Sequence, residues 1–358
     1  MNILFISARE YTYERNTSII KALRKFSNVE ILSPAKKPRS LILTSLFLWF
    51  KFLVKRNKKK YEIIYIGFYG YFLIVLIRFF TKTPIIFDAF LSNFDTLIID
   101  RKIAKDNSLV SKLSKFLDKY ACKLSNHVLI DTESNSKYFQ SKYNIPSKNI
   151  TSIPVGCDED LFFYREHYLP VSTIKTVLFY STYLPLHGVP IIINAAKLLR
   201  HKNVKFLLIG NGQEFKKSVQ LINTYELNNI KLKDFVCLGE LSKIIKESDI
   251  CLGGHFGGNE KAKRVIPGKI YQILASGKPL IASDTDANKE LLIDRKNALL
   301  IPQNDPKSLA SAIYELVIDQ DLSNYLAKNG RLLFLDRCSN EKISIRLKEI
   351  INGISSID

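Results

Sequence analysis

Residues 249–283 read DICLGGHFGGNEKAKRVIPGKIYQILASGKPLIAS and contain one complete strand–helix–strand pattern. Short apolar runs at Asp249–Leu252 and Pro279–Ser283 predict two buried strands, and the segment 267–276 predicts a helix between them. A strand, a helix and a second strand of these lengths form a βαβ unit, in which the two strands are parallel. The stretch therefore predicts an α/β fold.

The same alternation extends over most of the chain. The other predicted strands are Asn2–Ser7, Val29–Leu32, Glu62–Gly67, Pro84–Asp88, His127–Asp131, Asn149–Ile153, Lys175–Tyr180, Val204–Gly210, Phe235–Leu238 and Ala298–Ile301. Helical patterns separate these strands, and the alternation pauses between 156 and 170. We expect two doubly wound, Rossmann-like domains facing a central cleft, with a linker near 155–172. The expected ranges are 1–160, 173–338 and a closing helix in 339–358 that can cross back to the first domain.

The composition is that of a cytoplasmic globular protein. The chain has 358 residues, of which 46% are hydrophobic and 24% charged, and this balance excludes a disordered chain. Its five cysteines include no CxxC pair, so we expect neither a disulfide framework nor a structural zinc site. The apolar start Ile3–Ile6 is too short for a secretion signal and runs directly into Arg9.

Positive charge is concentrated in the first domain. The formal net charge is +19, and residues 1–105 hold 19 Lys or Arg against 7 Asp or Glu, a net of +12. The apolar stretch 41–54 is too short to span a membrane and precedes a basic cluster in 55–60. This combination suits an anionic membrane surface, and the alternative is a core helix followed by a solvated turn. No nucleic-acid-binding motif is present, so no nucleic acid partner is expected.

Four loops of the second domain follow predicted strands and are candidates for ligand binding. After Leu252, glycines are expected to leave backbone amides open to a ligand, and Lys269 falls in the first turn of the next helix. The positive end of a helix and a lysine suit a diphosphate. Gln272 lies one turn further on and can reach sugar hydroxyls. The other three loops contain His187, Gly210 and Glu290.

In the first domain, Asp88 is expected at the carboxyl end of a strand. It could act as a base, bind an acceptor hydroxyl, or cap the next helix. Asp131 and Thr132 end the following strand, and Thr132 is expected to be a helix cap. No cluster has metal-ligand spacing, and no GxSxG or Walker sequence is present, which excludes the common hydrolase and ATPase classes.

Taken together, these motifs resemble the family 4 glycosyltransferases, which are retaining enzymes with the GT-B fold. The likeness is strongest in Thr176–Gly188 and Gly253–Glu290, and it extends to Ile85–Arg101 in the first domain. The resemblance implies a nucleoside diphosphate sugar as donor, no obligatory metal, and a lipid-linked or glycan acceptor. It places Asp88 and Lys269 in catalysis, and it places in donor binding His187, Gly188, Gly210, Gly257, Gly258, Arg264, Lys269, Gln272 and Glu290.

The chain departs from the family pattern at the donor site. The paired glutamates of the family fall at Arg264 and Gln272, His187 occupies the position of a lysine, and Ser7–Arg9 replaces an N-terminal glycine-rich loop. Two alternatives therefore remain beside a glycosyltransferase at the cytoplasmic membrane face. One is a catalytically impaired relative that serves as a membrane-associated partner subunit, and the other is a nucleotide-sugar epimerase of the same fold.

Overall fold

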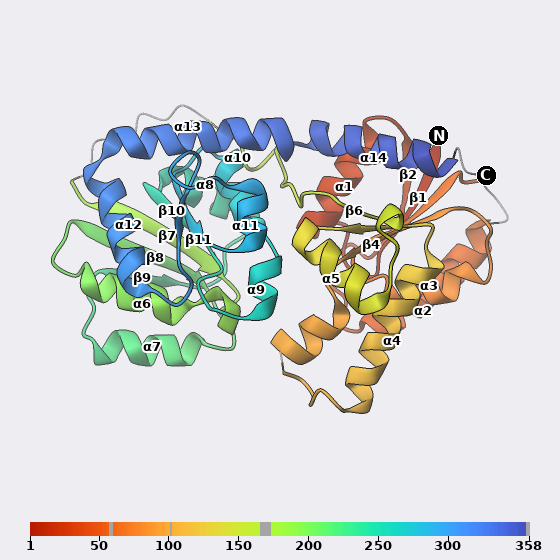
Figure 1. The fold of residues 1–358 in the computed structure, drawn as a ribbon, viewed down its shortest axis with the longest axis horizontal. Helices are drawn as coiled ribbons and strands as arrows, with labels where there is room; N and C mark the ends of the chain where they lie inside the picture. Colours follow the sequence, from red (N-terminus) through yellow and green to blue (C-terminus); the bar gives the residue numbers. More distant parts are fainter. Residues whose placement is uncertain (57–59, 101, 165–172, 356–358) are drawn as a thin grey trace. The chain divides into compact units, whose positions relative to one another are not determined.

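The computed structural model describes residues 1–56, 60–100, 102–164 and 173–355. The chain forms two compact units, one of Met1–Cys157 with Cys338–Asp358 and the other of Asp158–Arg337. Each unit contains a six-stranded parallel sheet with helices packed against it (Figure 1). The expected α/β fold with two Rossmann-like domains is confirmed. Part of the expected linker, residues 165–172, lies outside the described residues.

The sheet of the first unit has the strand order β2-β1-β3-β4-β5-β6. Its strands are β1 (Asn2–Ile6), β2 (Asn28–Leu32), β3 (Ile63–Ile66), β4 (Ile85–Phe90), β5 (His127–Ile130) and β6 (Ile150–Ser152). The central strands β3 and β4 are buried along their whole length and are mostly apolar, because both faces of the sheet are covered by helices. Burial of both faces is the physical reason that these strands are evident in the sequence.

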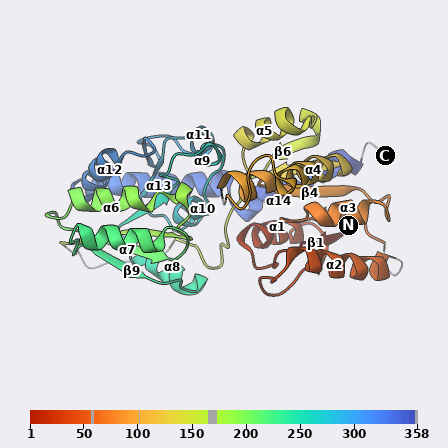
Figure 2. The ribbon, with the colours of Figure 1, turned by 90° about the horizontal axis from the view of Figure 1, so that it is seen from below.

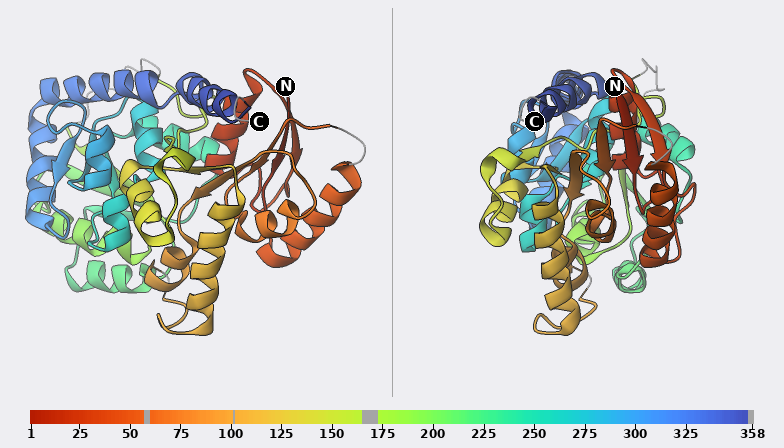
Figure 3. Two further views of the ribbon diagram at one scale, coloured as in Figure 1. Left: turned by 45° about the vertical axis from the view of Figure 1, so that its right-hand side comes forward. Right: turned by 90° about the vertical axis from the view of Figure 1, so that its right-hand side faces the viewer.

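Helices of the first unit form two layers, one on each face of this sheet. One layer contains α1 (Glu14–Arg24) and α14 (Asn340–Ser355), which pack against each other (Figure 1). The other layer contains α2 (Leu41–Arg56), α3 (Tyr71–Arg78), α4 (Leu109–Leu124) and α5 (Glu133–Tyr143). In this layer α2 lies beside α3 (Figure 2), and α4 extends past the strands of the sheet (Figure 3).

The sheet of the second unit has the order β12-β11-β10-β7-β8-β9. Its strands are β7 (Lys175–Ser181), β8 (Val204–Gly210), β9 (Ile230–Lys233), β10 (Ile250–Gly254), β11 (Leu280–Ser283) and β12 (Leu299–Ile301). The helices are α6 (Val189–Leu198), α7 (Phe215–Thr224), α8 (Leu238–Glu247), α9 (Glu260–Arg264), α10 (Gly268–Ala275), α11 (Asp286–Leu291), α12 (Pro306–Ile318) and α13 (Gln320–Arg337). The central strands β7 and β10 are neighbours, so the loops after them meet at one edge of the sheet.

Two local predictions are wrong. The strand expected at Phe235–Leu238 is instead β9 at Ile230–Lys233, and Leu238 begins α8. The edge strand β9 is only partly buried and alternates Ile and Leu with Lys, so it lacks the apolar run that marks a central strand. The glycines Gly253 and Gly254 belong to β10, and a short capped helix, α9, occupies part of the expected glycine loop.

Helix starts follow side-chain caps that the sequence supplies. Thr132 accepts a hydrogen bond from the Asn135 N–H at the start of α5, as predicted. Asn259 and Thr285 cap α9 and α11 in the same way. Each cap satisfies one of the backbone N–H groups that the first turn of a helix leaves unpaired.

Asp118 is a buried carboxylate on α4 that holds the segment after β4. It accepts hydrogen bonds from the Ser92 hydroxyl at 2.6 Å, the Tyr143 hydroxyl at 2.8 Å, and the backbone N–H groups of Asn93 and Phe94 at 2.9 and 3.0 Å. Removal of the carboxylate would leave these buried donors without an acceptor, which is among the costly changes inside a protein.

We therefore expect Asp118→Ala to lower the free energy of unfolding by about 3 kcal/mol. Urea denaturation of the purified variant measures this change. The matched control is Asp106→Ala. Asp106 is an exposed residue that precedes α4, and its carboxylate pairs with Lys115 of α4. The control should unfold at the wild-type urea concentration, and an equal loss in both variants would contradict the role given to Asp118.

Candidate functional site

The residues predicted for donor binding gather at the carboxyl edge of the second sheet. The loop after β7 contains a 3-10 turn, Pro185–His187, and the loop after β10 leads to α9 and α10. In parallel α/β sheets, ligands bind beyond the carboxyl ends of the strands. Because β7 and β10 are neighbouring strands, their loops form one continuous surface at that edge.

Glycines allow these two loops to touch through their backbones. A Cβ on Gly188 would lie 2.4 Å from the Gly257 nitrogen, and a Cβ on Gly257 would lie 2.2 Å from the Pro185 carbonyl oxygen. Gly188 also has a φ of +69°, in the left-handed region. The Gly257 N–H donates to the Leu186 carbonyl at 3.1 Å, and this hydrogen bond joins the loops.

The expectation that the glycine amides of this loop are open to a ligand is wrong for Gly257 and Gly258. The Gly257 N–H is used by Leu186, and the Gly258 N–H donates to the Asn304 side-chain oxygen at 3.1 Å. A Cβ on Gly210 would lie 1.9 Å from the Ser181 carbonyl oxygen, so this glycine also permits a close backbone contact. Donor binding by these glycines stays a prediction, and their visible effect is to bring loops together.

The contact between the loops stacks two histidines. The rings of His187 and His255 are 5.5 Å apart between centroids, with an interplanar angle of 25°. His187 Nδ1 accepts a hydrogen bond from the Leu184 N–H at 3.1 Å, so the proton of the neutral ring lies on Nε2. His255 is 6% exposed, and its Nδ1 makes no hydrogen bond with any described residue.

Two lysines bear on this pair. Lys269 lies in the first turn of α10, as predicted, and its Nζ is 5.0 Å from the centroid of the Phe179 ring. Lys261 is a buried residue of α9. Burial lowers the pKa of both imidazoles well below the ordinary value, and the positive charges of Lys269 and Lys261 lower the pKa further. Both histidines are therefore neutral near pH 7, and the cluster can accept negative charge.

The remaining predicted donor residues lie around this cluster. Gln272 is buried on α10, and its side-chain oxygen accepts a hydrogen bond of 2.6 Å from the Tyr180 hydroxyl. Arg264 ends α9, and Glu290 lies on α11, the helix that packs against α9. The ribose role predicted for Gln272 stays a prediction, because its side-chain oxygen is already used inside the unit.

The structure corrects the environment predicted for Asp88 in the first unit. Asp88 lies inside β4 and is 1% exposed, so it neither ends the strand nor caps a helix. The Arg15 guanidinium donates to its two oxygens at 2.9 and 3.2 Å, and the Tyr65 hydroxyl donates at 3.0 Å. A catalytic role for Asp88 stays a prediction that this environment disfavours, since a proton would have to displace Arg15.

Sequence reasoning missed His255, Lys261 and Arg15. His255 stands between two glycine pairs in the loop after Leu252, and three strands, β8, β9 and β10, separate it from His187 in the sequence, so only the fold brings the rings together. Arg15 looks like an ordinary basic residue of α1, although it is fully buried. Among the described residues, no group of three or more His, Cys, Asp or Glu side chains could hold a metal ion.

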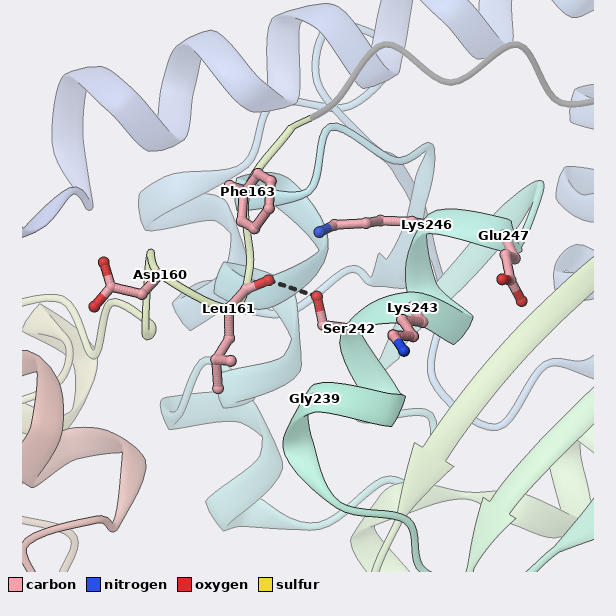
Figure 4. A pocket seen from close by; sticks show the side chains of 8 residues that line it. All are labelled: Asp160, Leu161, Phe163, Gly239, Ser242, Lys243, Lys246 and Glu247. Carbon is pink, nitrogen blue, oxygen red and sulfur yellow. Dashed lines mark hydrogen bonds between the residues drawn. The ribbon is translucent and has the colours of Figure 1, made fainter.

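A separate cavity of about 390 Å³ lies beside α8, and neither histidine of the pair lines it. Its lining residues are Asp160, Leu161, Phe163, Gly239, Ser242, Lys243, Lys246 and Glu247 (Figure 4). The Ser242 hydroxyl donates to the Leu161 carbonyl oxygen at 2.5 Å, and Lys246 Nζ lies 3.5 Å from the centroid of the Phe163 ring. These contacts attach the segment that begins the second unit to α8, so we assign the cavity no ligand.

Helices α2 and α4 of the first unit expose apolar side chains to solvent. The exposed apolar residues are Ile42, Leu43, Leu46, Phe47, Phe50 and Val54 on α2, and Leu109, Val110, Leu113, Phe116 and Tyr120 on α4. Helix α2 contains no acidic residue, and Asp118, the acid of α4, is buried. Basic residues such as Lys51 and Lys112 are exposed among them. We call these apolar and basic side chains the α2–α4 surface.

No helix in the described ranges is long and apolar enough to cross a membrane. The apolar stretch 41–54 lies in helix α2. Lys58 and Lys59 of the basic cluster lie outside the described residues. Both helices pack on α3, and each presents several exposed apolar side chains rather than a single scattered one.

Residues 163–333 match the family described as glycosyl transferases group 1. This range covers most of the second unit, including the histidine pair and the two lysines.

Two curated relatives are similar over parts of their length. An uncharacterized glycosyltransferase, MJ1178 of Methanocaldococcus jannaschii, is 24% identical over 249 residues, or 67% of this chain and 63% of the relative. The phosphatidyl-myo-inositol mannosyltransferase of Mycolicibacterium smegmatis is 25% identical over 158 residues, or 43% of this chain and 39% of the relative. The chain thus spans less than two thirds of the length of these relatives.

The fold is also that of a solved structure, Anabaena Alr3699/HepE in complex with UDP. The TM-score is 0.73 at 17% sequence identity, and the alignment covers 99% of this chain and 100% of the other. At this identity, the likeness shows that the two proteins share a fold.

We expect Lys269→Ala to weaken binding of a nucleoside diphosphate by about 2 kcal/mol, or roughly 30-fold, because a charged hydrogen bond to phosphate would be lost. Calorimetric titration measures the change, and thermal unfolding checks that the variant is folded. The matched control is Lys263→Ala, which removes an exposed lysine of α9 that pairs with Glu260 at 2.7 Å. Equal affinity of wild type and Lys269→Ala would show that the diphosphate does not bind at α10.

Proposed function

We propose that the chain is a group 1 glycosyltransferase with the GT-B fold that moves a sugar from a nucleoside diphosphate sugar to a lipid-linked or glycan acceptor. The observation that carries this proposal is the cluster of His187, His255, Lys261 and Lys269 at the carboxyl edge of the second sheet. His255 and Lys261 are buried, and His187 and Lys269 are partly exposed. A site with two lysines and two neutral imidazoles suits a ligand with several negative charges. A diphosphate has that charge, and the related fold of Alr3699/HepE holds UDP.

In the proposed reaction, the bond between the anomeric carbon and the diphosphate oxygen breaks, and a bond from the anomeric carbon to the acceptor hydroxyl oxygen forms. The hydroxyl proton passes to the leaving diphosphate. Negative charge grows on the leaving diphosphate during this step. We expect Lys269, the first-turn N–H groups of α10 and the Nε2–H of His187 to stabilise this charge. Because these groups are in place before the ligand arrives, little reorganisation is needed. Retention of configuration and independence from a metal follow from the resemblance to family 4.

We assign the acceptor side to the first unit. The α2–α4 surface combines apolar side chains with basic ones and has no exposed acid on either helix. Aromatic and aliphatic side chains enter the interface of a bilayer, while lysines and arginines attract anionic lipids. The proposed location is therefore the inner face of the cell membrane. A relative named as a phosphatidyl-myo-inositol mannosyltransferase supports a lipid-linked acceptor.

The first test is titration of the purified protein with UDP, GDP, ADP and dTDP in the absence of metal. We expect saturable binding of one of these nucleotides, because the cationic cluster is preformed. Its sugar conjugate is then incubated with candidate acceptors. Absence of binding to all four nucleotides would favour the inactive partner subunit, and conversion of the sugar without any acceptor would favour an epimerase.

The second test concerns the membrane. Phe47 and Phe50, which are 57% and 63% exposed on α2, are replaced together by Ser. We expect binding to vesicles that contain anionic lipid to weaken by at least about tenfold, because two aromatic rings no longer enter the interface. Vesicle sedimentation measures this binding.

The matched control replaces Tyr325 and Leu332 by Ser. These residues of α13 are exposed to a similar degree, 51% and 54%, but they belong to the second unit. The control should bind vesicles as the wild type does. If the α2 variant also keeps wild-type binding, the α2–α4 surface is not the membrane contact.

A further inference from the structure

His255 is a polar residue whose burial has no internal explanation. Its Nδ1 makes no hydrogen bond with any described residue, although only 6% of the residue is exposed to solvent. A buried polar atom without a partner costs free energy, so such atoms usually indicate a ligand or a water that completes the site. The backbone carbonyl of His255 accepts a hydrogen bond from the Gln303 amide at 3.1 Å, which holds this segment in place.

The charges around the histidine pair have one sign. His187 is contributed by the loop after β7, His255 by the loop after β10, Lys261 by α9 and Lys269 by α10. The charged groups that lower the pKa of both rings are Lys261 and Lys269, and both are positive. With no ligand present, a proton on either ring would be repelled by both lysines.

A bound diphosphate reverses this balance. Two phosphate groups next to the rings would offset the positive charge of the lysines, and phosphate oxygens accept hydrogen bonds from imidazolium N–H groups. Protonation of a ring, which is unfavourable in the empty site, then becomes favourable. Ligand binding and proton binding to the pair are therefore linked.

We propose that His187 and His255 bind the donor diphosphate as a pair and take up a proton from solvent when it binds. This inference rests on the proposed function, and it adds His255 as a donor-binding residue and a proton to the binding reaction. A consequence is that donor affinity increases as the pH falls, by up to about tenfold per pH unit while one proton is taken up.

A nucleotide sugar is the appropriate probe. Each phosphate of the diphosphate in UDP-glucose is a diester-like group that does not titrate near pH 7, whereas free UDP has a terminal phosphate whose pKa is near 6. A proton taken up with UDP-glucose must therefore be bound by the protein. If the nucleotide titration identifies another base, the glucose conjugate of that base replaces UDP-glucose.

The experiment is calorimetry of UDP-glucose binding at pH 7.5 in buffers of different ionisation enthalpy. The dependence of the observed enthalpy on the buffer gives the number of protons taken up. We expect wild type to take up a substantial fraction of one proton, and His187→Gln and His255→Gln each to bind more weakly and to take up less. The matched control is His201→Gln, because His201 is an exposed histidine of the same unit. The control should keep the wild-type uptake.

A second measurement needs no variant. The titration of the imidazole C–H resonances of the wild-type protein is followed by NMR with and without UDP-glucose. We expect the pKa of His187, of His255 or of both to rise on binding.

The outcomes separate this inference from the function on which it rests. Binding of the nucleotide sugar without proton uptake, or with uptake that is unchanged in both histidine variants, overturns the role of the pair and leaves the glycosyltransferase proposal intact. Failure of every nucleotide and nucleotide sugar to bind overturns the donor site itself, and the inference with it.

Discussion

The candidate site depends on one backbone contact, between the loop after β7 and the loop after β10. Gly188 and Gly257 permit this contact, because a side chain at either position would collide with the backbone of the other loop. The contact stacks His187 on His255 beside the positive end of α10. A larger residue at either glycine would move the two rings apart, although every charged side chain of the cluster would still be present. The geometry of the cluster is therefore set by backbone packing, and its chemistry is added by the side chains.

Charged side chains have different surroundings in the two units. In the first unit, Asp88 and Arg15 are fully buried and satisfy each other, so the pair joins β4 to α1 and is complete without a ligand. In the second unit, desolvation and then the positive charges of Lys261 and Lys269 lower the pKa of His187 and His255. Binding of a negatively charged group would stabilise that cluster. The contrast gives a physical reason to assign a structural role to the first group and ligand binding to the second.

The helix layer of the first unit shows a third arrangement, in which apolar residues are left exposed. Helix α2 buries Ser45, Leu48 and Phe52 against the sheet side and presents most of its other apolar side chains outward. This is the reverse of an ordinary amphipathic helix, whose outer face is polar. Basic residues accompany these apolar side chains, and the proposed membrane contact rests on this combination.

The sequence by itself determined the strand–helix alternation, the parallel sheets, the cap at Thr132 and the position of Lys269 in a first turn, because these follow from short-range periodicity and local hydrogen bonding. It also indicated the family through motif order. It placed β9 wrongly, since an edge strand lacks the apolar run of a central one. Only the tertiary structure decided that Asp88 is held by Arg15, that Gly257 and Gly258 use their amides internally, and that His255 meets His187. These contacts join residues more than 40 positions apart, and such pairings depend on strand order in the folded sheet, which local sequence does not encode.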